Sequence, residues 1–433
     1  MFEFLHAADL HLDSAMHGVV RYDGLPVERL RRATRGALEA LVDLALRRRV
    51  AFVLLAGDLF DHECEDFNTP LFFRAQLERL ARAGIRVLVV QGNHDAADHS
   101  MGRAYALDLP AGVTLFPVEA PTSVELSDLR VVVHGQGYRT RDVTENLARA
   151  YPARRPGWFN VGLLHANVHE SGSAHRDYAP CTVADLAERG YDYWALGHVH
   201  QRWARRAGDA WIVYPGNLQG RHARETGPKG CTLVTVDHGA VTEVAHVPLD
   251  VVRWERLEVD ASALEVDAPE ALVSAVVEQV AQAQADAGRF LVARVVVRGA
   301  TPAHDALVAG GRRWEDALRL GVVRRCPGAA ALEKVLLETA PPPAAAEHDA
   351  EAAAALGELL AHLDGPLLEE AYAAVRDEIA RAVDQIPSDP RDEQGDGALS
   401  FADEAQRRAL LHDVEAFLRA ALRGPDLAGP GGA

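Results

Sequence analysis

Gly92-Asn93-His94-Asp95 follows the apolar run Ile85–Val90, and this stretch decides the fold that we expect for the chain. A short run rich in β-branched residues predicts a buried strand, and its polar end places an amide, an imidazole and a carboxylate at the carboxyl end of that strand. In α/β proteins, ligands bind at the carboxyl ends of the strands. The stretch therefore predicts a functional site at the edge of a sheet.

Four further apolar runs end in the same kinds of side chain. They are Phe2–Ala7 before Asp9-Leu10-His11, Phe52–Ala56 before Gly57-Asp58, Val161–Leu164 before His165, and Tyr191–Leu196 before Gly197-His198-Val199-His200. Any one of these alone would be weak evidence, because a strand-end aspartate often caps a helix and a lone histidine is usually structural. Five such runs in one chain indicate that the strand ends form a single site.

The alternation of strands and helices favours an α/β fold. The expected strands Phe2–Ala7, Phe52–Ala56 and Ile85–Val90 are separated by helical spacing at Val27–Arg49 and Phe67–Ala83. Strands connected in this way run parallel in one sheet. We expect Val113–Phe116 and Val131–His134 in a second sheet, and Val161–Val247 has the short apolar runs and turns of a β-sandwich. The predicted core is a two-sheet β-sandwich flanked by helices.

The chain is expected to have three parts. Residues 1–250 would form the ligand-bearing domain, residues 251–340 a small capping α/β domain, and residues 347–423 a helical C-terminal segment after the linker Pro341-Pro342-Pro343. The last part has a helical apolar stripe at Leu368–Ile386 and a helix starting near Ser400. These helices either dock onto a partner helix or pack on each other or on a second protomer.

Composition and charge limit the class of protein. Of 433 residues, 48% are hydrophobic and 25% are charged, as in a soluble globular protein. The sequence has neither a signal-peptide pattern nor an apolar run of about 18 residues, so we expect a cytoplasmic protein that does not cross a membrane. The net charge is −18, but residues 1–250 contribute only −4 of it. The ligand-bearing part is therefore compatible with a polyanionic partner.

The strand-end side chains predict a centre for two divalent metal ions. The candidate ligands are Asp9, His11, Asp58, Asn93, His165, His198 and His200. This set is large enough for two ions that share one carboxylate about 4 Å from each other, and Asp58 is the natural bridge. Nitrogen and oxygen ligands without thiolate suit Mn²⁺, Fe²⁺ or Zn²⁺ better than Ca²⁺ or Cu⁺, and Mn²⁺ is the ion that we expect.

These motifs resemble the five motifs of the calcineurin-like metallophosphoesterases across roughly residues 1–240. Finer details are similar to DNA-repair exonucleases of the SbcD and YhaO type: Leu163–Asn167, Tyr214–Asn217, Gln219–His222 and Glu225–Cys231. The resemblance implies that one ion is held by Asp9, His11, Asp58 and His200, and the other by Asp58, Asn93, His165 and His198. It also implies that His94 faces the scissile phosphate, where it stabilises charge or protonates the leaving oxygen, with Asp95 orienting it.

The sequence departs from this group at one position. Many relatives have a second catalytic histidine three residues after the bridging aspartate, where this chain has Asp61 followed by His62. Either His62 substitutes for that histidine, or the second imidazole is dispensable, or the activity is weaker than the family suggests.

A basic cluster follows the last metal motif. It consists of Arg202, Arg205, Arg206, Arg221, His222, Arg224 and Lys229. Arginine matches phosphate oxygens in a bidentate manner, so we expect these residues to contact DNA phosphates, although the solvated rim of a β-hairpin would have the same composition. Without a motif for base readout, DNA ends or unusual DNA structures are the expected substrates.

The favoured function is two-metal hydrolysis of DNA phosphodiesters, by an exonuclease with some endonuclease activity in DNA repair or end processing. One alternative is a phosphatase or phosphodiesterase for a small substrate or a phosphoprotein, because one fold can host many activities. Another is a scaffold that binds DNA ends and has weak catalysis. The resemblance also suggests a homodimer that works with an SbcC-type coiled-coil ATPase.

Overall fold

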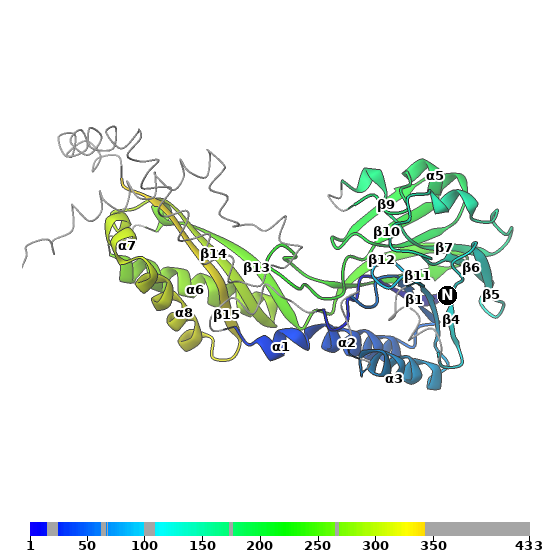
Figure 1. The fold of residues 1–433 in the computed structure, drawn as a ribbon, viewed down its shortest axis with the longest axis horizontal. Coiled ribbons are helices and arrows are strands. Elements are labelled where there is room, and N and C mark those ends of the chain that lie inside the picture. The colour runs from blue at the N-terminus through cyan, green and yellow to red at the C-terminus, as the bar shows by residue number, and fades with distance from the viewer. Residues whose placement is uncertain are drawn as a thin grey trace, which may run out of the picture. The chain divides into compact units, whose positions relative to one another are not determined.

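The computed structural model describes residues 1–14, 25–61, 66, 68–98, 109–172, 176–264 and 268–342 (Figure 1). It divides into two compact units. The first comprises Met1–Arg256, Gln282–Arg294 and Cys326–Lys334, and the second comprises Leu257–Ala281, Val295–Arg325 and the chain from Val335 onward. The predicted helical segment at residues 347–423 lies outside the described residues, and the predicted domain boundaries stay predictions.

The first sheet has six strands in the order β12-β11-β1-β2-β3-β4. They are β1 (Phe2–Ala7), β2 (Phe52–Ala56), β3 (Arg86–Val90), β4 (Val113–Leu115), β11 (Gly230–Asp237) and β12 (Ala240–Pro248). Strands β1 to β3 are parallel, as expected, β4 continues the parallel set, and β11 pairs antiparallel with β1. The prediction that Val113–Phe116 joins the second sheet was wrong, because Val113 pairs with Val87 of β3 and so extends the first sheet.

Two helices cover the outer face of this sheet. Helix α2 (Ala33–Arg48), preceded by the short α1 (Val27–Arg31), and α3 (Asn68–Arg82) contribute apolar side chains such as Leu41 and Leu77 to one buried cluster with the strands. The predicted helix at Val27–Arg49 therefore exists with an interruption at Arg32. Gly84 has φ +73°, the left-handed conformation that ends α3 before the next strand.

The second sheet also has six strands, in the order β5-β6-β7-β8-β10-β9. They are β5 (Thr122–Leu126), β6 (Val131–Gln136), β7 (Phe159–His165), β8 (Tyr193–Gly197), β9 (Trp203–Ala207) and β10 (Ala210–Tyr214), with the short helix α5 (Val183–Glu188) before β8. An apolar core joins the two sheets: the Phe4 ring stacks on Phe52 at 4.7 Å between centroids and meets Tyr193 edge-on at 5.2 Å. The expected two-sheet sandwich is confirmed.

The third sheet is small and has the strand order β13-β14-β15. Its strands are β13 (Val252–Asp260), β14 (Phe290–Ala300) and β15 (Ala330–Ala340), and helices α6 (Pro269–Ala287), α7 (His304–Gly310) and α8 (Arg312–Arg325) lie between them in sequence. A small α/β part was expected over residues 251–340, but α7, α8 and β15 were not identified from the sequence. Among the described helices, none is both long and apolar enough to cross a membrane.

Candidate metal centre

The seven predicted ligands lie at or just beyond the carboxyl ends of five parallel strands. Asp9 and His11 follow β1, Asp58 follows β2, and Asn93 follows β3. His165 is the last residue of β7, and His198 and His200 follow β8. All except His200 are buried, with at most 5% of their surface exposed. The carboxyl ends of β1, β2 and β3 in the first sheet and of β7 and β8 in the second thus bring these side chains together in the protein interior.

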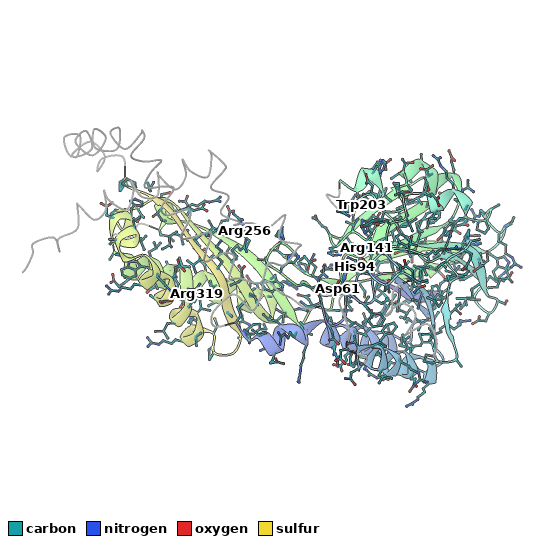
Figure 2. The ribbon with its side chains drawn as sticks, viewed as in Figure 1. Asp61, His94, Arg141, Trp203, Arg256 and Arg319 are labelled. Atoms are coloured by element: carbon teal, nitrogen blue, oxygen red, sulfur yellow. The ribbon has the colours of Figure 1, made fainter. Side chains whose placement is uncertain are left out.

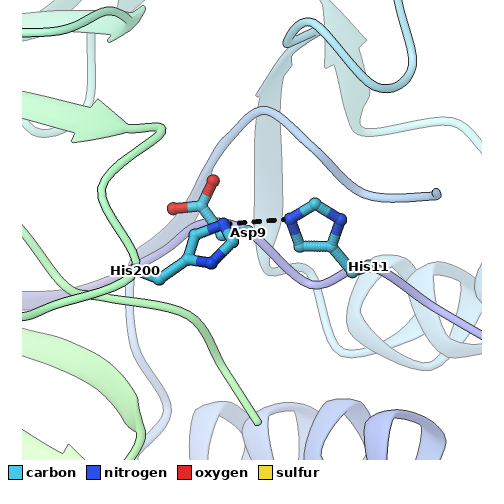
Figure 3. A group of neighbouring side chains, drawn as sticks. All are labelled: Asp9, His11 and His200. Atoms are coloured by element: carbon cyan, nitrogen blue, oxygen red, sulfur yellow. Dashed lines mark hydrogen bonds between the residues drawn. The ribbon is translucent and has the colours of Figure 1, made fainter. Parts of the chain in front are cut away.

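Asp58 lies between two groups of ligands. Its Oδ2 is 3.8 Å from Nε2 of His11 and 3.5 Å from Nε2 of His165. On the first side, Nε2 of His11 lies 3.2 Å from Nε2 of His200, and Asp9 belongs to the same cluster (Figure 3). On the second side, Nε2 of His165 lies 3.0 Å from Oδ1 of Asn93. The Asp58 carboxylate therefore lies between the two groups, and its role as a ligand shared by two ions stays a prediction.

The ring of His198 lies beside His165 of the second group and its backbone contacts Asp9 of the first, but its ring nitrogens belong to none of the clusters of candidate ligand atoms that lie within 4.8 Å of one another among the described residues. Its imidazole centroid is 5.3 Å from that of His165, and its Nε2–H donates to the carbonyl oxygen of Arg176 at 2.9 Å. Its backbone N–H donates to both carboxylate oxygens of Asp9, at 3.0 and 3.1 Å. Since Nε2 has this protein partner, Nδ1 is the nitrogen that could bind an ion.

The buried carboxylates fit divalent cations. Within the described residues, the ion pairs of Asp58 are with imidazoles, and the Asp9 carboxylate accepts hydrogen bonds from a backbone amide. Burial and the charge of Asp58 raise the pKa of Asp9 well above its usual range. Burial would also raise the pKa of Asp58, but His165, His94 and His11 hold it below the usual range. Two buried carboxylates among nitrogen donors are a donor set that first-row divalent ions bind well.

Two of the imidazoles are oriented for coordination by hydrogen bonds on the other ring nitrogen. Nδ1–H of His165 donates to the carbonyl of Ala56 at 2.9 Å, and Nδ1–H of His200 donates to Oε1 of Glu225 at 2.7 Å. In both rings Nε2 is then the lone-pair nitrogen that faces the cluster, as is usual for metal-binding histidines. Sequence reasoning missed Glu225, although it lies in the Glu225–Cys231 stretch that supported the family resemblance.

The backbone is strained at four of the seven positions. Asp9, His11, Asp58 and His198 have φ values of +52°, +42°, +52° and +103°. Residues other than glycine rarely adopt positive φ, and such strain is concentrated at functional sites, where it fixes side chains in one direction. The strain supports a functional role for this cluster.

The glycines of the motifs are required by space. A Cβ atom at Gly92 would lie 2.8 Å from the backbone N of Asp58 and even closer to Oδ1 of the same residue. A Cβ atom at Gly197 would overlap the carbonyl oxygen of Ala56. Neither glycine has positive φ, so the close approach of two strand-end loops is the reason for the missing side chain.

His94 is hydrogen-bonded to Asp61, whereas the Asp95 carboxylate, which was expected to orient His94, accepts hydrogen bonds from backbone amides of the loops. Nδ1–H of His94 donates to Oδ1 of Asp61 at 2.8 Å, and these two side chains lie together in Figure 2. The Asp95 carboxylate instead accepts backbone hydrogen bonds from Gly92 at 2.7 Å and Leu59 at 3.1 Å, because it turns back into its own loop. Asp95 thus fixes the loops, and its burial raises its pKa to about 7.

The Asp61 departure therefore has a structural meaning. Burial alone would lower the pKa of His94, but the charges of Asp58 and Asp61 raise it above its usual value. At this position the chain thus has a carboxylate that accepts a hydrogen bond from the His94 ring. The alternative that His62 substitutes concerns a residue outside the described part of the chain.

The structure splits the predicted basic cluster into two sets. Arg202, Arg205, Arg206, His222 and Arg224 are exposed, with Arg205 and Arg206 on the edge strand β9. Arg221 and Lys229 are mostly buried and have protein partners: Nζ of Lys229 donates to the carbonyl of His200 at 2.9 Å, and Arg221 pairs with Asp61 and Glu225. Phosphate contact by any of the seven residues stays a prediction, and for Arg221 and Lys229 it would compete with these protein partners.

Comparison with known proteins agrees with this geometry. Residues 2–202 match the family described as calcineurin-like phosphoesterase, and residues 254–340 match the middle domain of metallophosphoesterase YhaO. The chain is 38% identical over 261 residues to the uncharacterized metallophosphoesterase YhaO of Bacillus subtilis. This alignment covers 59% of this chain and 62% of that protein. It is 24% identical over 221 residues to the DNA double-strand break repair protein Mre11 of Saccharolobus solfataricus. That alignment covers 49% of this chain and 53% of the relative.

A crystal structure of a protein from Thermus thermophilus covers 57% of this chain and 98% of its own at 16% identity, with a TM-score of 0.36. The alignments with the two curated relatives span less than two thirds of those relatives' own length. The first match covers β1 to β8 with all seven predicted ligands, and the second covers the small third sheet from residue 254 onward. Residues 203–253, which include β9 to β12, lie between the two matches. The chain therefore carries a calcineurin-like phosphoesterase domain followed by a domain of the YhaO middle-domain family.

Proposed function

We propose that this protein is a two-metal phosphodiesterase that acts on DNA, an exonuclease with some endonuclease activity in DNA repair or end processing. The observation that supports hydrolysis most directly is the position of Asp58, whose Oδ2 lies within 3.8 Å of imidazole nitrogens from both ligand groups. A carboxylate shared in this way is the central feature of two-metal sites that bind and cleave phosphate esters.

The ligand assignment follows the two groups. Asp9, His11, Asp58 and His200 would hold one ion, and Asp58, Asn93, His165 and His198 would hold the other, with Mn²⁺ as the proposed metal. When bound, such ions supply Lewis-acid stabilisation of phosphate oxygens and lower the pKa of a water molecule between them. The chain's own contribution is to orient His165 and His200, whose Nδ1–H groups donate to the Ala56 carbonyl and the Glu225 carboxylate, so that Nε2 of each ring would be the nitrogen available to an ion.

His94 is the proposed proton donor. With Nδ1–H bonded to Asp61, Nε2 is the remaining ring nitrogen, and the raised pKa of His94 favours the form that has a proton there. A proton at Nε2 can stabilise charge on the phosphate or neutralise the oxygen that leaves. The Asp58 carboxylate also accepts the His94 backbone N–H at 2.9 Å, so the ligand and the proton donor are held in one fixed relation.

DNA is proposed as the substrate on two grounds. Relatives at 24% identity are named DNA double-strand break repair proteins, and exposed arginines such as Arg205 and Arg206 can contact phosphates without reading bases. Residues 1–250 have a net charge of only −4, which allows a polyanion to approach. A homodimer and an SbcC-type coiled-coil ATPase as partner belong to the same proposal and come from the resemblance.

The test is hydrolysis of four substrates in parallel by the full chain. They are end-labelled duplex DNA, end-labelled single-stranded DNA, an aryl phosphodiester and an aryl phosphomonoester, each with Mn²⁺, Mg²⁺, Zn²⁺ or a chelator. The proposal predicts Mn²⁺-dependent shortening of DNA from its ends and cleavage of the diester, both absent in Asp58→Ala. Hydrolysis of the monoester with intact DNA would contradict it and would favour a small-substrate or phosphoprotein phosphatase.

A further inference from the structure

Arg221 lies between two carboxylates that serve different parts of the site. Its Nη1 is 3.6 Å from Oδ2 of Asp61, and its Nη2 is 3.2 Å from Oε1 of Glu225. Only 14% of the Arg221 side chain is exposed, and the two carboxylates are 15% and 6% exposed. The planar guanidinium presents several N–H donors in fixed directions and can pair with two carboxylates at once, whereas the lysine ammonium is a compact point charge without this fork.

Each of these carboxylates orients one imidazole. Asp61 accepts Nδ1–H of His94, the proposed proton donor, and Glu225 accepts Nδ1–H of His200, a proposed ligand. The guanidinium therefore stands at the centre of a chain of contacts that runs from the proton donor to the metal ligand. Neither carboxylate can move without disturbing Arg221.

The turn that carries Arg221 is itself held firmly. The Trp254 indole N–H donates to the carbonyl of Gly220 at 3.0 Å, and the buried Gln219 side chain accepts from the Val251 amide at 2.8 Å and donates to the Val252 carbonyl at 2.6 Å. The Arg221 amide donates to Oε2 of Glu225 at 2.7 Å. With backbone and side chain both anchored, the guanidinium has a defined place relative to the two carboxylates.

The charges explain why a cation is needed there. Asp61 and Glu225 are largely buried, and Asp61 and the buried Asp58 carboxylate both accept hydrogen bonds from His94. A buried carboxylate without a counter-charge is strongly unfavourable, and removing the cation of a buried pair leaves that charge uncompensated. Without Arg221, both carboxylates would lose the cation that they share and would move toward solvent, and each would lose its hold on its imidazole.

We propose that Arg221 is a positioning residue that couples the two halves of the site, fixing His94 through Asp61 and His200 through Glu225. This assigns it a role different from contact with substrate phosphate. The half that concerns His94 rests on the proposed function, whereas the half that concerns His200 requires only that the site bind metal. The two halves can therefore fail separately.

The first experiment measures Mn²⁺ binding by titration calorimetry on the full chain. Loss of a group that orients a metal-binding histidine lowers metal affinity by about 10- to 100-fold, so Arg221→Gln should show a loss in that range. The matched control is Arg294→Gln, which breaks another buried pair: Arg294 and Glu333 are 15% and 4% exposed and joined at 2.7 Å. The control should keep wild-type affinity.

The second experiment compares turnover at saturating Mn²⁺ on DNA and on an aryl phosphodiester. A good aryl leaving group needs little help from a proton donor, so Arg221→Gln should lower kcat at least about 10-fold more on DNA than on the aryl ester, with KM little changed. A phosphate contact would behave differently: KM on DNA would rise, and the salt dependence of binding would flatten by about one unit.

The outcomes separate the proposals. Unchanged Mn²⁺ affinity in folded Arg221→Gln, or an equal loss in Arg294→Gln, would overturn the coupling role, as would the pattern of a phosphate contact. If the wild type binds Mn²⁺ but cleaves no phosphodiester, the proposed function fails while the calorimetry still tests the His200 half. Should Arg221→Gln not fold, Arg221→Lys retains the charge without the planar fork, and the coupling role predicts a weaker Mn²⁺ affinity for it as well.

Discussion

Gly92→Ala tests whether close packing of the strand-end loops positions the ligands. The added methyl group would lie 2.8 Å from both the backbone N of Asp58 and Cε1 of His165, against an ordinary contact of at least 3.4 Å. These atoms must therefore move by about 0.6 Å, and Oδ1 of Asp58 by more. Overpacking of this kind costs about 1–3 kcal/mol of stability, and a misplacement of about 1 Å at a reacting centre can cost about 100-fold in rate.

The assay is Mn²⁺ stoichiometry by elemental analysis together with kcat on an aryl phosphodiester and the free energy of unfolding. Gly36→Ala is the control: it lies in α2, its added methyl group would be 3.3 Å from the Val251 side chain, and alanine is favoured over glycine in a helix by about 1 kcal/mol. We expect reduced Mn²⁺ content and at least about 100-fold lower kcat in Gly92→Ala, with neither in Gly36→Ala. Two tightly bound ions and unchanged kcat in Gly92→Ala would refute the reasoning.

Three further predictions concern the proton donor, the exposed arginines and the fold. His94→Gln should keep two Mn²⁺ per chain by elemental analysis and lose about 100-fold or more in kcat, and loss of metal would make His94 a ligand. Replacing Arg205 and Arg206 by Gln should reduce the slope of log affinity for DNA against log salt concentration by about 0.9 per lost contact. An unchanged slope would show that these two arginines are solvated surface residues without phosphate contacts. Asp185 forms a capping box with Thr182 at the start of α5. Burial would raise the pKa of Asp185, but hydrogen bonds from Thr182 and Arg149 lower it from 3.8 to about 2. The stability that the Asp185 carboxylate contributes is therefore present above pH 4 and lost as the pH falls toward 2. Asp185→Ala should therefore lower the free energy of unfolding by about 1 kcal/mol at pH 7 and by less near pH 3 in denaturant titrations, and a difference that does not depend on pH would contradict this.

The strands of the core and the grouping of the ligands could be predicted because both depend on local pattern. Buried parallel strands are continuous apolar runs, and the polar residues that end them must lie at one edge of the sheet. His165 is a clear example. It is the last residue of β7, so it had to lie beside the carboxyl ends of the neighbouring strands. The sheet that Val113–Leu115 joins could not be predicted, because three residues of intermediate burial contain no pattern that selects a partner.

The supporting residues around the ligands could not be predicted, because their roles depend on tertiary contacts. Asp95 follows His94 directly in sequence, yet the partner of His94 is Asp61, which is 33 residues away. The positive charge of Arg221 and Lys229 is evident from sequence, whereas their burial against acceptors of the protein is not. Glu225 had no signal of its own beyond its place in a stretch resembling a known family.

The central claim is that Asp58 joins two metal ions in one centre. The most direct measurement is the electron paramagnetic resonance spectrum of the protein loaded with Mn²⁺, because two ions about 4 Å apart through a shared carboxylate are magnetically coupled. The account predicts two ions per chain with a coupled spectrum in the wild type, and loss of the coupling in Asp58→Ala. A single ion per chain, or two ions with independent signals in the wild type, would contradict it.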